Sequence, residues 1–401
     1  MTVKNHRHHS LALLLAIVLT GLNLRPALAA ISPLLGDIRA DLPLSFSMLS
    51  LLTMLPVVAM GLAMFWAPGV VARYGERRVI VAGLLAIGLA SLARAQLSSA
   101  QVLIASALAA GCGIALIQAL MPGLIKRCFP SRAAGMMGLY VTAIMGGAAL
   151  AAAASSSLLD ALGGWRGALA SWSALAALAL AAWTFAQGVE GAAGKAGCAQ
   201  GQGAGEFAAA PRAWTLGIFF GLGTASYTCV LAWLPQYYVE LGWSGSQAGG
   251  LLAWLTSMEV ASGLLTPALA SRSLDRRPVL FVLLLLIIAG FCGLAWAPDA
   301  AALLWAAMLG LGIGGLFPTS MIVSMDHLED AARAGRLTAF VQGVGYLIAA
   351  LSPLAAGWIR DASNGFTQSW LLLAACTVSM LWLAARFQPK HYARQFAGSG
   401  A

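Results

Sequence analysis

Long apolar stretches recur along the whole 401-residue chain, and short polar segments separate them. Each stretch holds about 20 residues or more, and a helix of that length crosses the ~30 Å hydrocarbon core of a bilayer. The pattern predicts twelve membrane-spanning helices and an all-α membrane protein. The predicted spans are roughly 11–35, 46–71, 79–98, 101–125, 134–158, 166–187, 213–238, 246–271, 278–297, 300–325, 334–360 and 368–386.

Composition supports the same conclusion. Hydrophobic residues make up 60% of the chain and charged residues only 9%, whereas a typical soluble domain carries about 25% charged residues. The lipid bilayer is therefore the expected surroundings of most of this chain.

The basic residues alternate between dense and sparse segments. If the N-terminus lies inside, the outer segments hold only Arg39, Arg94, Arg166 and Arg360. The inner segments hold Lys4, Arg7, Arg73, Arg77, Arg78, Lys126, Arg127, Arg132, Lys195, Arg212, Arg272, Arg276, Arg277, Arg333, Arg336, Arg386, Lys390 and Arg394. This asymmetry predicts that both termini are cytoplasmic. It also explains the net charge of +9 without a nucleic-acid partner.

An internal repeat relates the two halves of the chain. The segment that begins Arg73-Tyr-Gly-Glu-Arg-Arg recurs 199 residues later as Arg272-Ser-Leu-Asp-Arg-Arg, and Gly111, Gly113 and Gly146 recur as Gly310, Gly312 and Gly345. Both halves start on the same side, so the repeat is parallel. We expect two six-helix bundles, 1–187 and 213–401, joined by a flexible cytoplasmic linker of Gly, Ala and Gln at 188–212.

Arg25 is the most informative residue, because it interrupts the first apolar run, LALLLAIVLTGLNLRPALAAISPLL. A guanidinium at membrane depth costs about 2.5–3.5 kcal/mol on insertion scales, so it usually faces a protein interior or a watery cavity. Pro26 predicts a kink that turns Arg25 sideways. The planar fork of donors suits an anionic or electron-rich ligand. The alternative is a buried ion pair, for which Glu259 is the natural partner.

Glu259 lies in the middle of the predicted eighth span. It can carry a proton if it is buried alone, or remain ionised as the partner of Arg25. A third possibility is that it has no part in transport.

Further polar and aromatic groups within the spans are candidate substrate contacts or interhelical hydrogen-bond partners. They are Asn23, Gln118, Tyr140, Tyr227, Trp233 and Gln342. The loop residues Arg73, Arg77, Arg272 and Arg276 are mainly topology determinants, with a possible second role in closing a cytoplasmic gate. No nucleophile–base pair, metal-ligand cluster, cofactor fingerprint or ATP-binding motif stands out, so we expect neither an enzyme nor a cofactor or metal.

Several motifs resemble one family over nearly the whole chain. They include Gly21-Leu-Asn-Leu-Arg-Pro26, Leu55-Pro-Val-Val58, Ile117-Gln-Ala-Leu-Met-Pro122, Pro211-Arg-Ala-Trp-Thr-Leu-Gly217, Ala232-Trp-Leu-Pro235, Asp326-His327 and Phe340-Val-Gln-Gly343. With twelve spans and parallel halves, the chain resembles the major facilitator superfamily, and within it the branch of cyanate permeases and 2-nitroimidazole transporters. Two positions depart from that pattern. Ala72 and Ser271 stand where the loop motif usually has an acid, and Glu259 stands where an uncharged residue is expected.

The resemblance implies a secondary transporter in the cell inner membrane that moves a small anionic or polar solute by alternating access. Protons are the candidate coupling ion, and we expect a monomer. Arg25 would bind cyanate, a carboxylate or a nitro group. One alternative is an efflux pump for nitroaromatic or drug-like compounds. An alternative of another class is a non-transporting membrane sensor on the same scaffold, although the linker and tails leave little room for a partner-binding domain.

Overall fold

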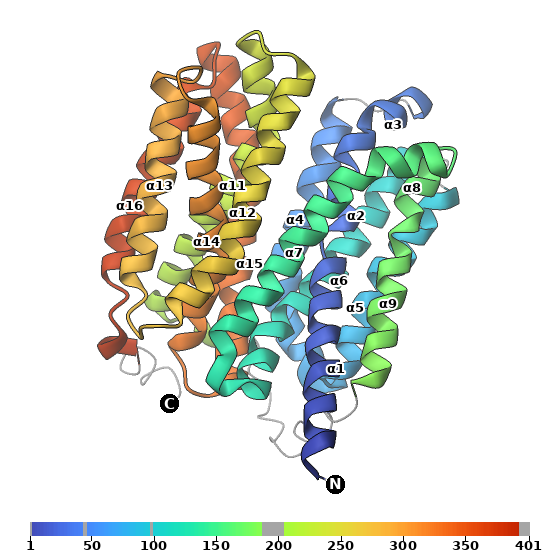
Figure 1. The fold of residues 1–401 in the computed structure, drawn as a ribbon, viewed down its shortest axis with the longest axis vertical. Helices are drawn as coiled ribbons and strands as arrows, with labels where there is room; N and C mark the ends of the chain where they lie inside the picture. The colour runs from blue at the N-terminus through green and yellow to red at the C-terminus, as the bar shows by residue number, and fades with distance from the viewer. Residues whose placement is uncertain (1, 43–45, 97–98, 187–203, 393–401) are drawn as a thin grey trace. The chain divides into compact units, whose positions relative to one another are not determined.

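The computed structural model describes residues 2–42, 46–96, 99–186 and 204–392. Most of the predicted linker, 188–203, lies outside these residues. Within the described part, twelve helical segments are long and apolar enough to cross a membrane, which confirms the predicted span count. Figure 1 shows the helices in chain order.

Helices of the N-terminal part are α1 (Thr2–Asn23), α2 (Pro26–Ala29), α3 (Leu35–Asp41), α4 (Phe46–Tyr74), α5 (Glu76–Ala93), α6 (Ala100–Cys128), α7 (Ala133–Ala161), α8 (Trp165–Ser171) and α9 (Ser173–Phe185). Those of the C-terminal part are α11 (Pro211–Glu240), α12 (Gly245–Ala270), α13 (Arg277–Trp296), α14 (Ala302–Asp326), α15 (Ala331–Ser363) and α16 (Thr367–Ala385). Short 3-10 turns lie at Ser32–Leu34, Arg94–Gln96, Pro130–Arg132, Ala204–Phe207 and Pro389–His391.

Local sequence explains several helix ends. Ser244 caps α12 in a reciprocal capping box with Gln247, and the Asp330 carboxylate accepts the amide of Arg333 at 2.7 Å at the start of α15. Asn364 ends α15 in the left-handed region at φ 56°, a conformation that Asn tolerates better than most residues.

The described chain divides into two compact units. The first comprises Met1–Met121 and Thr142–Ala204, and the second comprises Pro122–Val141 and Gly205–Ala401. The second unit thus takes in a segment, 122–141, that the sequence repeat assigns to the first half. The half boundaries inferred from the repeat, 1–187 and 213–401, remain a prediction.

Helix α9 packs against α1 and α5 in the first unit. The Trp183 indole donates to the Thr20 hydroxyl at 2.9 Å and so joins α9 to α1. A separate apolar cluster, built around Ile31, Leu169 and Trp172, fills the end of this unit near α3 and α8.

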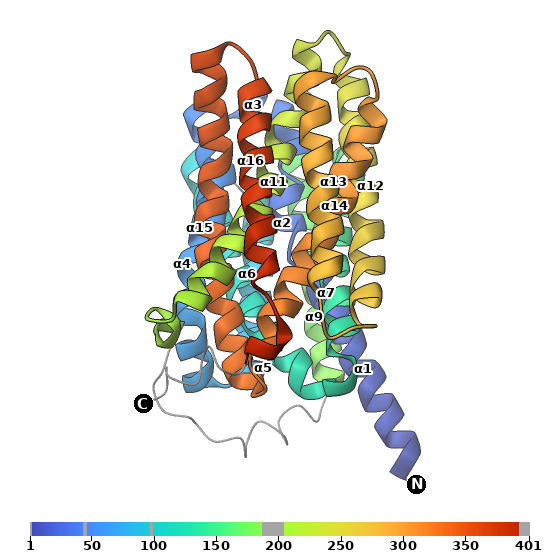
Figure 2. The ribbon, with the colours of Figure 1, turned by 90° about the vertical axis from the view of Figure 1, so that its left-hand side faces the viewer.

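The second unit pairs α11 with α15, α12 with α14, and α13 with both α14 and α16, as Figure 2 shows for α13, α14 and α16. Its core includes the large apolar side chains of Leu284, Phe291 and Trp370, which are completely buried.

Glycines at equivalent positions of the repeat make equivalent helix contacts in each unit. A Cβ on Gly111 would lie 2.7 Å from the Pro56 carbonyl oxygen, and one on Gly310 would overlap the Leu255 carbonyl. The two pairs differ by the same 199 residues. Small residues allow helix backbones this approach, so the repeat preserves packing geometry as well as sequence.

Three contacts explain why 122–141 belongs to the second unit. Lys126 bonds backbone carbonyls near the end of α14. Gly123 meets the backbone of Gly335, since a Cβ there would lie 3.3 Å from the Gly335 Cα, and a Cβ on Gly138 would overlap the Pro267 ring.

Candidate functional site

The first span is interrupted at Arg25. Helix α1 ends at Asn23 and α2 begins at Pro26, with Arg25 between them at φ −111° and ψ −27°. A proline has no backbone N–H, and its ring restricts the residue before it. The predicted kink is a break between α1 and α2, and the 3-10 turn Ser32–Leu34 follows α2 within the predicted span 11–35.

The Arg25 side chain is half-buried beside this break. Within the described residues of the first unit, no hydrogen bond or ion pair holds its guanidinium. Asn23, two residues earlier, is 1% exposed, and its side-chain nitrogen has no acceptor among the described residues. Within the first unit, the break thus carries two polar groups with unused donors.

Packing around the break accommodates the carbonyls it leaves without amide partners. The regular partner of the Leu22 carbonyl would be the amide of residue 26, which is proline. Gly147 of α7 lies directly against this carbonyl, since a Cβ there would overlap the Leu22 oxygen. Only a residue without a side chain allows α7 to lie this close.

Arg94 is a residue whose role the sequence interpretation missed. The charge pattern places Arg94 in an outer segment, but in the structure it is 0% exposed at the end of α5. Its Nε donates to the Ser106 hydroxyl at 3.0 Å, and its Nη1 donates to the Ala27 carbonyl of α2 at 2.6 Å. The sequence offered one signal, which is that Arg94 stands at the very end of an apolar span. Residue types in a sequence window do not distinguish a buried arginine at that position from an exposed one in a loop.

The remaining candidates divide between the units. Gln118 is 1% exposed on α6 in the first unit. In the second unit, Tyr140 on α7 and Gln342 on α15 are both fully buried, and Tyr227 on α11 is half-buried. The Trp233 indole donates to the Pro353 carbonyl at 2.9 Å, so its polar atom serves the packing of α11 on α15.

Glu259 lies in the middle of α12 and is only 2% exposed. Its Oε1 has no hydrogen-bond partner among the described residues of the second unit. Gly314 of α14 packs against its backbone, since a Cβ at Gly314 would overlap the Glu259 carbonyl. An ionised carboxylate without a partner is far more costly to bury than a neutral acid.

The four loop arginines expected at a gate have different surroundings. Arg73 and Arg272 are exposed. Arg77 donates to the Trp183 carbonyl at 3.4 Å. Arg276 is 6% exposed, and its Nε donates to the Asp326 carboxylate of α14 at 3.0 Å. In the second unit, a charge contact thus joins the loop between α12 and α13 to α14, although position 271 carries Ser in place of an acid.

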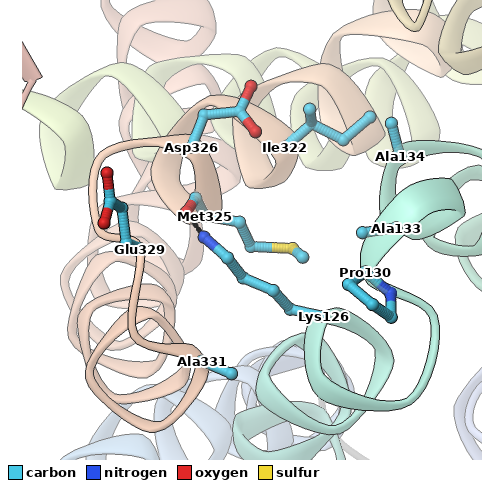
Figure 3. A pocket seen from close by; sticks show the side chains of 9 residues that line it. All are labelled: Lys126, Pro130, Ala133, Ala134, Ile322, Met325, Asp326, Glu329 and Ala331. Carbon is cyan, nitrogen blue, oxygen red and sulfur yellow. Dashed lines mark hydrogen bonds between the residues drawn. The ribbon is translucent and has the colours of Figure 1, made fainter.

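Lys126 belongs to the inner basic residues of the sequence analysis, which assigns it no role at the site. Its ammonium donates to the carbonyls of Met325, at 2.6 Å, and Leu328, at the negative end of the α14 dipole. It lines a cavity of about 190 Å³. Figure 3 shows Lys126 pointing from the end of α6 to the Met325 carbonyl, with Asp326 and Glu329 on the far side.

A buried histidine lies next to this region. His327 is 2% exposed, accepts a hydrogen bond from Arg212 Nε at 3.0 Å, and uses its other ring nitrogen to donate to the Val323 carbonyl at 2.7 Å. Tyr392 stacks on its ring with centroids 3.8 Å apart. Burial, with a further effect from Arg212, lowers the pKa of His327 to about 3. The neutral ring that this implies is the form that can accept from Arg212.

Comparison with known proteins agrees with this architecture. The model of the Major Facilitator Superfamily matches residues 11–353 and, in a second overlapping match, 260–401. The chain is 40% identical over 380 residues to the cyanate transport protein CynX of Escherichia coli (strain K12), covering 95% of this chain and 98% of that protein. It is 31% identical over 374 residues to the 2-nitroimidazole transporter of the same organism, covering 92% and 93%.

Among solved structures, the chain resembles the proton:xylose symporter XylE bound to 6-bromo-6-deoxy-D-glucose, with a TM-score of 0.79, 16% identity and 96% coverage of both chains. It also resembles the Escherichia coli fucose:proton symporter FucP, with a TM-score of 0.74, 15% identity and coverage of 94% and 98%. At these identities the likeness concerns the fold. The family match and the two relatives confirm the resemblance drawn from the motifs, and they identify a multi-pass membrane transporter: the chain belongs to the Major Facilitator Superfamily.

Proposed function

We propose that this chain is a secondary transporter of a small anionic or polar solute, with cyanate as the first candidate. Support comes from the cyanate transport protein that is 40% identical over 95% of this chain, and from a cation with unused donors at the break in the first span. Arg25 would bind the negative or electron-rich end of the solute.

Arg25 is the residue on which this proposal depends. Its guanidinium presents a planar set of donors that can contact two ligand atoms at once. Arg25 lies at the break between α1 and α2, where neighbouring backbone groups also lack their regular helical hydrogen-bond partners. Asn23, at the same break, would add a neutral donor. Gln118, Tyr140, Tyr227, Trp233 and Gln342 are the further proposed contacts.

Glu259 is the proposed site of proton coupling. Its buried carboxyl has an oxygen without a hydrogen-bond partner in the described part of the second unit. Such a site binds and releases a proton only when its surroundings change, and a transport cycle supplies that change. The competing role, an ion pair with Arg25 in part of the cycle, is separated from this one below.

The remaining parts of the proposal concern topology and motion. We place the chain in the inner membrane with both termini in the cytoplasm, because the basic segments alternate as the positive-inside rule requires. Two repeat-related halves would rock about a central site. Arg73, Arg77, Arg272 and Arg276 would act at the cytoplasmic gate, and the chain would work as a monomer.

Export of nitroaromatic compounds is the second candidate, supported by the 2-nitroimidazole transporter at 31% identity over 92% of this chain. A nitro group presents two oxygens to Arg25 in the same geometry as a carboxylate, so the two functions share one binding group.

The test is transport by the purified chain in proteoliposomes. Labelled cyanate, a small labelled carboxylate and labelled 2-nitroimidazole are offered with and without a pH gradient, and empty liposomes serve as the control. We expect saturable cyanate counterflow that a pH gradient converts into accumulation. Movement of 2-nitroimidazole alone would favour the second candidate. Movement of none of the three would count against transport of this class and favour a sensor on the same scaffold.

A further inference from the structure

Arg94 forms a buried hydrogen bond with the first span, which an arginine that only determines topology would not need. Its side chain is fully buried, and its Nη1 donates to the Ala27 carbonyl at 2.6 Å. In a regular helix the Ile31 amide would donate to the Ala27 carbonyl. Here it donates to the Leu28 carbonyl at 3.4 Å instead. Arg94 therefore takes the place of a backbone donor just beyond the break that carries Arg25.

The guanidinium of Arg94 is itself held in direction. Its Nε donates to the Ser106 hydroxyl at 3.0 Å, and that hydroxyl donates in turn to the Leu103 carbonyl of α6 at 2.7 Å. Three helical segments, α2, α5 and α6, are thus connected through one side chain. Such a chain of hydrogen bonds fixes both distance and orientation.

Stability alone does not account for this residue. No ion pair joins Arg94 to an acid among the described residues, and its Nη2 is buried without an acceptor. A buried cation with an unsatisfied donor is costly. Arg94 donates to the Ala27 carbonyl, two residues beyond Arg25. We infer that this costly buried side chain serves to hold α2 in position after the break.

We propose that Arg94 is a positioning residue: by holding the Ala27 carbonyl, it fixes the break in the first span and thereby sets the affinity of Arg25 for the transported solute. This inference rests on the proposed function of Arg25. It assigns to Arg94 no contact with the solute, and it makes Ser106 the residue that aims Arg94.

The experiment measures the half-saturating concentration of labelled cyanate in counterflow, together with the maximal rate, for Arg94→Lys, Arg25→Lys and the double variant. Lysine keeps the charge at residue 94 but loses the fork that reaches Ala27 and Ser106 together. We expect Arg94→Lys to raise the half-saturating concentration about tenfold, as a displaced binding group does, while the maximal rate stays within about twofold.

The double variant distinguishes positioning from a general structural role. If Arg94 acts through Arg25, the double variant should have the same half-saturating concentration as Arg25→Lys alone, because there is no fork left to position. If the two effects multiply instead, Arg94 acts independently and the proposal is overturned. If Arg25→Lys leaves the half-saturating concentration unchanged, the proposed function fails and the inference fails with it.

A milder variant covers the case in which Arg94→Lys does not fold. Ser106→Ala removes the acceptor that aims Arg94 without changing any charge, and we expect about a threefold rise in the half-saturating concentration. Ser91→Ala is the matched control, since Ser91 is also a buried serine, on the same helix as the Arg94 turn, and its hydroxyl has no partner among the described residues. An unchanged value for Ser106→Ala, equal to that of Ser91→Ala, would contradict the proposal.

Discussion

Replacing Glu259 by Gln separates its two proposed roles with one change. Glutamine has nearly the same shape, carries no charge and cannot take up a proton. Glu259 is 2% exposed, and its Oε1 has no partner among the described residues of the second unit. The substitution therefore changes protonation while it leaves the packing against Gly314 almost intact.

The expected magnitudes differ between the roles. If the buried carboxyl is neutral and carries the coupled proton, Gln should change the free energy of unfolding by no more than about 1 kcal/mol, the net value of one hydrogen bond. If it is ionised and paired with a cation, Gln leaves that cation alone and should lower the free energy of unfolding by about 3–5 kcal/mol. The thermal unfolding midpoint of the purified protein distinguishes a change of this size.

Transport supplies the second measurement. A gradient of one pH unit is worth about 1.4 kcal/mol per proton, or up to about tenfold accumulation of a solute coupled to one proton. In Glu259→Gln, counterflow exchange of labelled cyanate should persist, because exchange needs no net proton movement, while pH-driven accumulation should vanish. Glu240→Gln is the control, since Glu240 forms an ion pair with Arg360 at 2.7 Å that is partly exposed.

Two results would refute the reasoning about Glu259. Normal accumulation with a normal unfolding midpoint in Glu259→Gln would leave it without either role. A large loss of stability in Glu259→Gln, restored without transport in Arg25→Leu/Glu259→Leu, would show an ion pair and reject the lone proton carrier.

Three further predictions concern stability, each measured as the unfolding midpoint of the purified protein. Gly314→Ala should lower the free energy of unfolding by about 1–3 kcal/mol, because the added Cβ overlaps the Glu259 backbone. Gly249→Ala is the control and should have no such effect, because a Cβ there meets nothing within 4 Å. Equal midpoints for the two variants would contradict this packing. Lys126→Met should lower it by about 1–2 kcal/mol, since two carbonyls at the end of α14 lose a charged donor that is partly exposed; no change would mean that water replaces the lysine. His327 has a pKa of about 3 in the folded chain and an ordinary value of 6.5, so the unfolded chain binds more protons between these pH values. Stability should therefore fall as pH drops below 6.5, by up to about 1.4 kcal/mol per pH unit. An equal slope of stability against pH in His327→Gln would refute this.

The span count and the helix interruption could be predicted because they depend on local sequence. Apolar length determines what can cross a bilayer, and Pro26 limits the helix wherever it lies. The repeat glycines could be predicted as helix contacts for the same reason. Their partners, such as Pro56 and Leu255, follow from three-dimensional packing.

The roles of Arg94 and Lys126 could not be predicted, because each depends on a backbone carbonyl distant in sequence. Residue type and position in an apolar window do not distinguish an arginine that ends a span in water from one whose donors reach Ala27. The Arg276–Asp326 pair is similar, since 50 residues separate its members. Contacts of this kind emerge only when the helices are packed together.

The central claim is that the fork of Arg25 binds the transported solute. The most direct measurement is equilibrium binding of labelled cyanate to the purified wild-type chain and to Arg25→Lys, with the unfolding midpoint of each recorded alongside. We predict that Kd rises at least about tenfold in Arg25→Lys, since lysine keeps the charge and loses the bidentate geometry, while the midpoint stays the same. An unchanged Kd would contradict the claim, and a large loss of stability with it would indicate that Arg25 serves the structure.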